Sequence, residues 1–290
     1  MIYVYRNAVK TTVILTLLAA LCVGVGSFFG SAGIVIGLII GLAFTGGSYW
    51  FSDSIAIRAS RAVPVSEAEM PQYYAVVRDL CGRAKMPMPR LYVTPDRQPN
   101  AFATGRNPDH AAVAVTAGIL DICTWEEMRG VLAHELSHVG NRDILISSVA
   151  ATIAMAVTLL ARMAAWGGLF FGGLGNRRDE GENILELLAM LILAPLAATL
   201  LQLALSRSRE FEADRSGAKL IGDGEPLARA LAKLDAASRQ IPMPYVRREM
   251  AGMYIVNPLA GMNVSMKRLF SDHPPTEERI ARLRSRSWGK

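Results

Sequence analysis

The chain has 290 residues, of which 51% are hydrophobic and 19% are charged, and its mean hydropathy of +0.27 is high for a soluble globular protein. The basic residues behind its net charge of +6 are spread along the sequence, which argues against a nucleic-acid partner and favours an acidic membrane surface. The cysteines have no paired spacing, so we predict reduced thiols at Cys22, Cys81 and Cys123.

The first predicted element is a helical membrane hairpin. Lys10 and Asp53 bracket 42 consecutive uncharged residues, enough for two spans of about 20 residues each. Residues 30–33 lie near the middle and are predicted to form the turn, and the spacing of Gly37 and Gly41 would allow close helix packing. Basic residues flank the hairpin but are absent from its turn, which predicts that both ends face the cytoplasm.

A compact lobe is predicted to follow the hairpin. The pattern indicates a helix over about 66–84, a strand at 90–94, a loop, and a second strand at 110–116. Small and branched residues alternate along the second strand, and we expect it to be an edge strand that lines a cleft. An extended polypeptide could add to this edge by main-chain hydrogen bonds, and the small side chains of Ala112 and Ala114 would let its backbone approach.

The most informative motif is His134-Glu135-Leu136-Ser137-His138, which is predicted to lie on a helix. Thr124 and Glu127 have the spacing of a capping box at the start of that helix. The two histidines project from one helix face and can bind one zinc ion. Glu135 projects to one side of them, where it can act as a general base on a water molecule.

A hydrolytic zinc site needs a third protein ligand. The remaining histidines, His110 and His273, lack helical spacing to the motif. Glu210 is a better candidate, because a helix in that region would place Glu210 and Asp214 on one face. Glu210 would bind the metal, and Asp214 would orient a ligand histidine through its free ring nitrogen.

Two further apolar stretches, at 144–175 and 184–206, are predicted to be membrane segments. A buried helical pair that lies in or on the membrane is the alternative. If both segments cross the membrane, residues 53–143 and 207–290 share the cytoplasmic side. The histidine pair and the third ligand could then meet close to the bilayer surface.

Six features in this order resemble the HtpX family of membrane-embedded zinc metalloproteases, which is related to the CAAX prenyl endopeptidases. They are the amino-terminal hairpin, residues 99–105, the His134–His138 motif, residues 140–143, residues 206–214 and His273-Pro274-Pro275. The resemblance spans nearly the whole chain. It implies zinc ligands at His134, His138 and Glu210, with Glu135 as the catalytic base.

The resemblance has further implications for substrate binding. It implies that His273 donates to the substrate carbonyl or the oxyanion, although a surface-turn role is an equal alternative. It also implies that Asn100 and Phe102 line the cleft, where a turn asparagine and a core phenylalanine are the alternatives. Substrates would be misfolded or damaged membrane proteins, cleaved in quality control.

The expected fold is mainly α with a small β-sheet: an integral membrane zincin with four transmembrane helices and a cytoplasmic catalytic domain. The predicted divisions are a hairpin over 1–52, a catalytic domain in two parts over 53–143 and 207–290, and a second membrane pair over 144–206. The expected activity is that of a zinc endopeptidase of the bacterial inner membrane with one zinc ion per chain. Two alternatives stay open, a CAAX-type prenyl peptidase and a non-enzymatic membrane scaffold with structural zinc.

Overall fold

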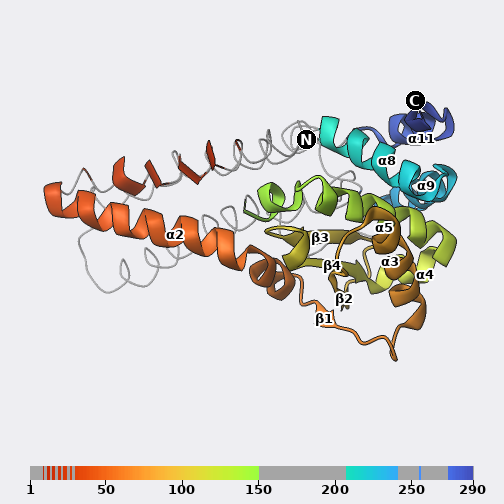
Figure 1. Cartoon of the computed structure of the whole chain (residues 1–290), viewed down its shortest axis with the longest axis horizontal. Helices are drawn as coiled ribbons and strands as arrows, with labels where there is room; N and C mark the ends of the chain where they lie inside the picture. The colour runs from red at the N-terminus through yellow and green to blue at the C-terminus, as the bar shows by residue number, and fades with distance from the viewer. Residues whose placement is uncertain are drawn as a thin grey trace, which may run out of the picture.

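The computed structural model describes residues 30–149, 207–240 and 274–289, together with Ile255 and a set of helical residues between 9 and 27. In this part the chain is mainly helical with one small mixed sheet, which confirms the predicted fold class at that level (Figure 1). The elements in chain order are α2 (Gly30–Ala59), β1 (Val63–Pro64), α3 (Pro71–Ala84), β2 (Arg90–Thr94), β3 (Ala101–Gly105), η1 (Pro108–His110), β4 (Ala111–Thr116), α4 (Ala117–Ile122), α5 (Trp125–Gly140), α8 (Arg207–Ile221), α9 (Glu225–Gln240), α11 (Thr276–Arg284) and η3 (Ser287–Gly289). Residues 144–149 are also helical.

The apolar helix α2 extends from the predicted hairpin into the lobe that carries the sheet (Figure 1). Its first residue, Gly30, has a φ of +75°, a left-handed conformation that suits glycine at a turn. A Cβ at Gly37 would overlap the carbonyl oxygen of Cys22, and one at Gly41 would lie 3.1 Å from Cα of Ala19. The two glycines therefore let an N-terminal helical segment pack closely against α2 in the antiparallel sense. Among the described residues, α2 is the one helix long and apolar enough to cross a membrane.

The sheet has the strand order β1-β2-β4-β3. Strands β2 and β4 are parallel, whereas β3 pairs antiparallel with β4 and β1 pairs antiparallel with β2. Helices cover both faces of the sheet. On one face the carboxyl end of α2 packs against β3 and β4, and on the other α3 and α5 bury a larger apolar core.

The prediction that residues 110–116 form an edge strand is wrong. Strand β4 lies inside the sheet between β2 and β3, and the segment predicted as a loop forms β3, which is an edge strand among the described residues. Ala112 and Ala114 are fully buried beneath α2, where they contact the cluster of Ala56 and Ile57. Their small side chains allow α2 to approach the sheet, so they do not present an open surface to a substrate backbone.

Helix α5 carries the histidine motif and begins as predicted. Thr124 is the N-cap residue, and the complete capping box joins its hydroxyl and backbone N–H to the backbone N–H and carboxylate of Glu127. The helix ends at Gly140, and Arg142 then adopts a φ of +57°. Asp143 N–H donates to the carbonyl of His138, so the chain turns back on the helix directly after the motif.

Helix α3 begins later than predicted. It starts at Pro71 rather than near Ser66, because proline suits the first helical position and residues 67–69 form a turn. Helix α11 likewise starts beside a proline, with Pro275 at its N-cap position. The three cysteines are free thiols, as predicted.

Some predictions concern residues outside the described part of the chain. They are the role of His273 and the membrane segments beyond residue 149 and up to residue 206. The third and fourth transmembrane helices and the role of His273 therefore stay predictions.

Candidate active site

Helix α8 crosses α5 at the histidine motif. Glu210, Asp214 and Gly217 recur at helical spacing and share the face of α8 that packs on α5. At Gly217 a Cβ would lie 2.9 Å from the backbone nitrogen of His134, so only glycine permits this close crossing. The absence of a side chain at Gly217 thus brings Glu210, two turns earlier, over the histidine pair.

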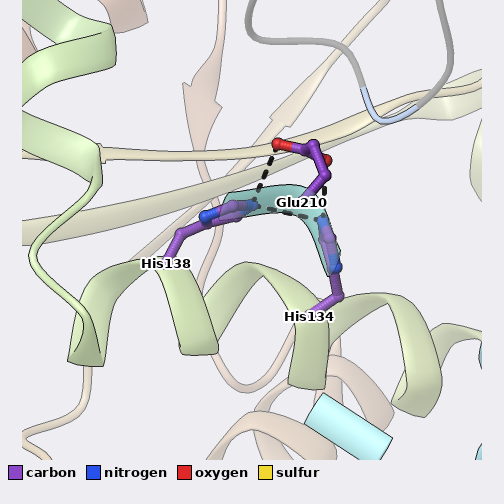
Figure 2. A group of neighbouring side chains, drawn as sticks. All are labelled: His134, His138 and Glu210. Carbon is purple, nitrogen blue, oxygen red and sulfur yellow. Dashed lines mark hydrogen bonds and ion pairs between the residues drawn. The ribbon is translucent and has the colours of Figure 1, made fainter. Parts of the chain in front are cut away.

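Three side chains converge between these helices, as Figure 2 shows. His134 and His138 rise from successive turns of α5, and Glu210 reaches them from α8. The two Nε2 atoms are 3.2 Å apart, and Glu210 Oε2 lies 3.6 Å from that of His134 while Glu210 Oε1 lies 3.6 Å from that of His138. The structure therefore brings together the three residues that the sequence singled out as metal ligands. Among the described residues, no fourth side chain belongs to this cluster.

The chemistry of this donor set fits a zinc ion. His134 Nδ1 lies 3.0 Å from Asp214 Oδ1, and His138 Nδ1 lies 3.3 Å from Asp143 Oδ2. A carboxylate beside Nδ1 favours the proton on that nitrogen, which leaves each Nε2 as a bare acceptor. Two acceptor nitrogens and a carboxylate then face one another, and either a proton or a metal cation between them would satisfy all three. Tetrahedral zinc bonds would separate the nitrogens by about 3.3 to 3.4 Å, close to the distance found.

Arg279 of α11 is almost fully buried and contacts Asp214. Its guanidinium donates to both carboxylate oxygens of Asp214, at 2.7 and 2.8 Å, and lies 3.7 Å from Glu210. Burial alone would raise the pKa of Asp214, but the charge of Arg279 outweighs it and holds that pKa below its ordinary value. Arg279 therefore keeps a buried carboxylate ionised beside His134.

Burial alone would lower the pKa of His134, since it disfavours the charged imidazolium. The carboxylates of Asp214 and Glu210 outweigh this effect and raise the pKa to about 9. The contact between His134 Nδ1 and Asp214, at 3.0 Å, contributes most to this rise, followed by the contact with Glu210. The negative field that stabilises a proton here equally stabilises a metal cation.

Glu135 lies beside the cluster without belonging to it. Its side chain is buried, and its carboxylate accepts a hydrogen bond from the backbone N–H of Ala103 in β3. Burial raises the pKa of Glu135 above its ordinary value, and the neighbouring histidines offset part of that rise. The position between the histidine pair and the edge strand suits a group that takes a proton from water.

The other predicted site residues lie elsewhere in the lobe. Asn100 is buried at the start of β3, where its side-chain oxygen accepts from the backbone N–H of Ile255. Phe102 packs beneath α2 on the face of the sheet opposite to α5. His110 is exposed and contacts the side chain of Asn107. These contacts give Asn100 and Phe102 structural roles, and their contact with substrate stays a prediction.

The sequence did not single out Asp143 or Arg279. Asp143 was part of the 140–143 pattern, and its position directly after a helix with a terminal histidine is a signal that could have identified it. Arg279 lies 65 residues from Asp214, and nothing local distinguishes it from the exposed arginines of α11. Its partners could be found only once the helices were packed together.

Residues 67–287 match the peptidase family M48. The chain belongs to peptidase family M48. It is 54% identical over 278 residues to the protein named Protease HtpX homolog from Syntrophobacter fumaroxidans, a match that covers 95% of this chain and 98% of that protein. The protein of the same name from Syntrophotalea carbinolica is 51% identical over 278 residues, which covers 96% and 98% of the two chains.

Membership in peptidase family M48 identifies the activity of this site. The chain is a zinc metallopeptidase of the HtpX type, and the cluster of His134, His138 and Glu210 is consistent with the zinc site of the family. The crystal structure of S. mikatae Ste24p has a similar fold, with a TM-score of 0.52 and 16% sequence identity over 98% of this chain and 67% of that one.

Proposed function

We propose that this metallopeptidase is an endopeptidase of the bacterial inner membrane that hydrolyses misfolded or damaged membrane proteins in quality control. The observation that supports it best is the position of Glu135, which lies between a three-ligand zinc cluster and the edge of the sheet. Helix α2 supports a membrane location, because it is long and apolar enough to cross a membrane. Its carboxyl end packs against the sheet, which ties the catalytic lobe to that helix. The basic ends of the hairpin favour a catalytic domain that faces the cytoplasm.

The chemistry follows from the residues around the cluster. His134, His138 and Glu210 would hold one zinc ion, which supplies a Lewis acid for the scissile carbonyl and lowers the pKa of water towards about 7. Glu135 takes the proton from the attacking water and passes it to the leaving amine. Its raised pKa makes it a stronger base than an exposed carboxylate and a competent acid in the second transfer. Asp214 and Asp143 orient the two imidazoles, and Arg279 keeps Asp214 ionised.

The substrate backbone docks along β3, the edge strand nearest to Glu135. One edge of β3 pairs with β4, and the N–H of Ala103 points away from that partner towards Glu135. A strand added beside β3 would place its peptide bonds next to both the base and the zinc cluster. Main-chain hydrogen bonds carry no side-chain information, which suits a protease that accepts many unfolded sequences. His273, from its His-Pro-Pro segment, would donate to the oxyanion.

The domain division of this proposal follows the sequence. A hairpin over 1–52 and a membrane pair over 144–206 anchor a catalytic domain formed by 53–143 and 207–290. The packing of α5 against α8 and α9 supports the union of the last two parts. Because α2 starts at the predicted turn and continues to Ala59, the second span of the hairpin and the catalytic domain share one helix.

Two variants test the proposal with purified protein in detergent. Glu135→Gln should keep zinc and lose peptidase activity by roughly 10²-fold to 10⁴-fold, whereas Glu210→Ala should lose both. An active Glu135→Gln enzyme would contradict the assigned base. Comparing cleavage of an unfolded membrane protein with that of a prenylated peptide distinguishes a general endopeptidase from a prenyl peptidase, and preference for the prenylated peptide would contradict the proposed substrate class.

A further inference from the structure

Helix α2 changes character at one position along its length. Twenty residues of α-helix span about 30 Å, the thickness of the hydrocarbon core of a bilayer, and counted from Gly30 this length ends near Trp50. No residue of α2 before Asp53 is charged. The large apolar side chains of this stretch are 42 to 62% exposed, at Ile34, Val35, Ile36, Leu38, Ile39, Ile40 and Leu42. This part of the helix is therefore suited to contact lipid tails.

The remainder of α2 belongs to the catalytic lobe. Asp53 is buried and pairs with Arg90 of β2 at 2.5 Å, and Ala56 and Ile57 pack against the sheet. An ion pair between helix and sheet requires that the part of α2 after Trp50 lies in a polar environment or inside protein. The passage from a lipid-facing to a protein-facing helix thus takes place within about one turn.

Trp50 and Phe51 mark this passage and are 57% and 62% exposed. The guanidinium carbon of Arg106 lies 4.6 Å from the centre of the Trp50 ring. Arg106 directly follows β3, and it has no carboxylate partner among the described residues. An exposed tryptophan stacked with an arginine that has no acidic partner is the combination that suits the headgroup region, where the ring meets the tails and the cation meets phosphate.

We infer that the boundary between lipid tails and headgroups crosses α2 at Trp50, and that Arg106 binds the phosphate groups of the lipid headgroups there. This inference rests on the proposed membrane location and adds the depth at which the catalytic site works. Arg106 lies only three positions after Ala103, whose N–H contacts Glu135. Because an extended residue spans at most about 3.3 to 3.6 Å, the backbone next to Glu135 lies within roughly 11 Å of the Arg106 backbone, which is one side-chain length from the headgroup phosphates.

This short distance specifies the substrate. Peptide bonds that reach Glu135 in the membrane-bound enzyme belong to segments directly beside a membrane span. Unfolded segments held farther from the bilayer would be poor substrates, even with the same sequence. The enzyme would therefore select juxtamembrane segments by position and would need little side-chain recognition.

The depth of Trp50 can be measured in vesicles that contain the full-length protein and spin-labelled phospholipids. The fluorescence difference between wild type and Trp50→Phe isolates Trp50, and Trp288→Phe gives the matched difference for a tryptophan near the C-terminus. A label near the glycerol backbone should quench Trp50 at least twofold more than a label near the end of the acyl chain, and neither should quench Trp288. Stronger quenching of Trp50 by the deep label, or quenching by neither, would overturn the boundary.

The role of Arg106 is tested in the same vesicles. Arg106→Gln should reduce quenching of Trp50 by the headgroup-level label about twofold, because the ring loses the cation that holds it at that level. Arg61→Gln is the control, since Arg61 is exposed and already paired with Asp96. Equal quenching in the two variants would contradict headgroup binding by Arg106. These measurements do not require proteolysis, so their outcome is independent of the proposed activity.

The preference for juxtamembrane segments can be tested with one cleavable sequence placed at two distances from the membrane. It follows a single membrane span either directly or after a rigid helical spacer of about 40 Å. In vesicles the sequence attached directly to the span should be cleaved at least tenfold faster, and equal rates would contradict the juxtamembrane preference. Detergent-solubilised enzyme should cleave the same sequence as a free peptide, and a failure there would count against the proposed peptidase and leave the measured depth unaffected.

Discussion

The two ends of helix α5 are held by opposite kinds of polar contact. At the amino end, Thr124 and Glu127 cap the helix, and Lys233 of α9 pairs with Glu127 at 2.7 Å. At the carboxyl end, the acceptor nitrogens of His134 and His138 face each other and a carboxylate from α8. Each contact of the first end joins groups that attract one another, whereas the second end brings similar groups together and depends on a cation.

The difference shows which end stabilises the fold and which end serves the reaction. A satisfied cap contributes about 0.5 to 2 kcal/mol and needs no ligand. A buried cluster of acceptors and acids costs free energy until a metal binds, and its folding is linked to metal binding. Substitutions at the amino end should therefore change the free energy of unfolding, and those at the carboxyl end should change zinc affinity and activity.

Arg279→Met should have the largest effect. It leaves the buried carboxylate of Asp214 without its cation, and removal of one partner of a buried ion pair costs about 3 to 5 kcal/mol. Zinc content and activity should fall with the free energy of unfolding, as measured by denaturant titration and metal analysis. Arg284→Met is the control, because its pair with Glu225 is exposed and should be worth at most about 1 kcal/mol. Equal losses in the two variants would show that the site does not depend on Arg279.

Gly217→Ala tests whether close packing positions the third ligand. The new Cβ would lie 2.9 Å from the backbone of His134, so α8 must move, at a cost of about 1 to 3 kcal/mol and with weaker zinc binding. Gly82→Ala is the matched control on α3, where nothing lies within 4 Å and alanine should stabilise the helix by up to about 1 kcal/mol. If both variants gain stability and bind zinc normally, the glycine crossing is not what places Glu210.

Asp143→Ala should reduce zinc affinity by about 10-fold to 100-fold, because His138 loses the carboxylate beside its Nδ1. Competition with a chelator measures this change. Asp121→Ala removes an exposed carboxylate from α4 and should leave the affinity unchanged. An Asp143→Ala enzyme with wild-type affinity would mean that the backbone alone orients His138.

Thr124→Ala should act only on stability. Loss of the cap hydroxyl should lower the free energy of unfolding by about 0.5 to 2 kcal/mol, while kcat of the folded enzyme stays at the wild-type value. Denaturant titration and a cleavage assay at low temperature measure the two quantities. A large fall in kcat would show that the two ends of α5 are coupled.

The smallest effect concerns the pH dependence of the cap. Burial would raise the pKa of Glu127, but Lys233 and the backbone N–H of Thr124 outweigh it and hold the pKa below the ordinary value of 4.5. The folded-state pKa is depressed, so the contribution to stability is present above pH 4.5 and is lost as pH falls through the lower, folded-state pKa. The stability difference between wild type and Glu127→Gln should therefore stay constant above pH 4.5 and shrink below it. A difference that does not change with pH would contradict the ionised cap.

Local sequence signals were sufficient for part of the fold. The capping box marked the first residue of α5, and the spacing of Glu210 and Asp214 indicated one face of a helix. The sequence of 101–105 does not indicate a strand, because both faces of β3 are buried and polar and apolar residues do not alternate along it. For the same reason β4 could not be assigned to the edge or the interior from its own sequence.

The sequence by itself indicated the candidate metal ligands, because helical spacing places His134 and His138 on one face of a helix and the family resemblance adds Glu210. Only the tertiary structure decided which strand forms the edge beside Glu135 and which arginine holds Asp214. Strand order and the burial of Arg279 depend on contacts between segments far apart in the chain. Such contacts are set by packing, and no local pattern of residue types encodes them.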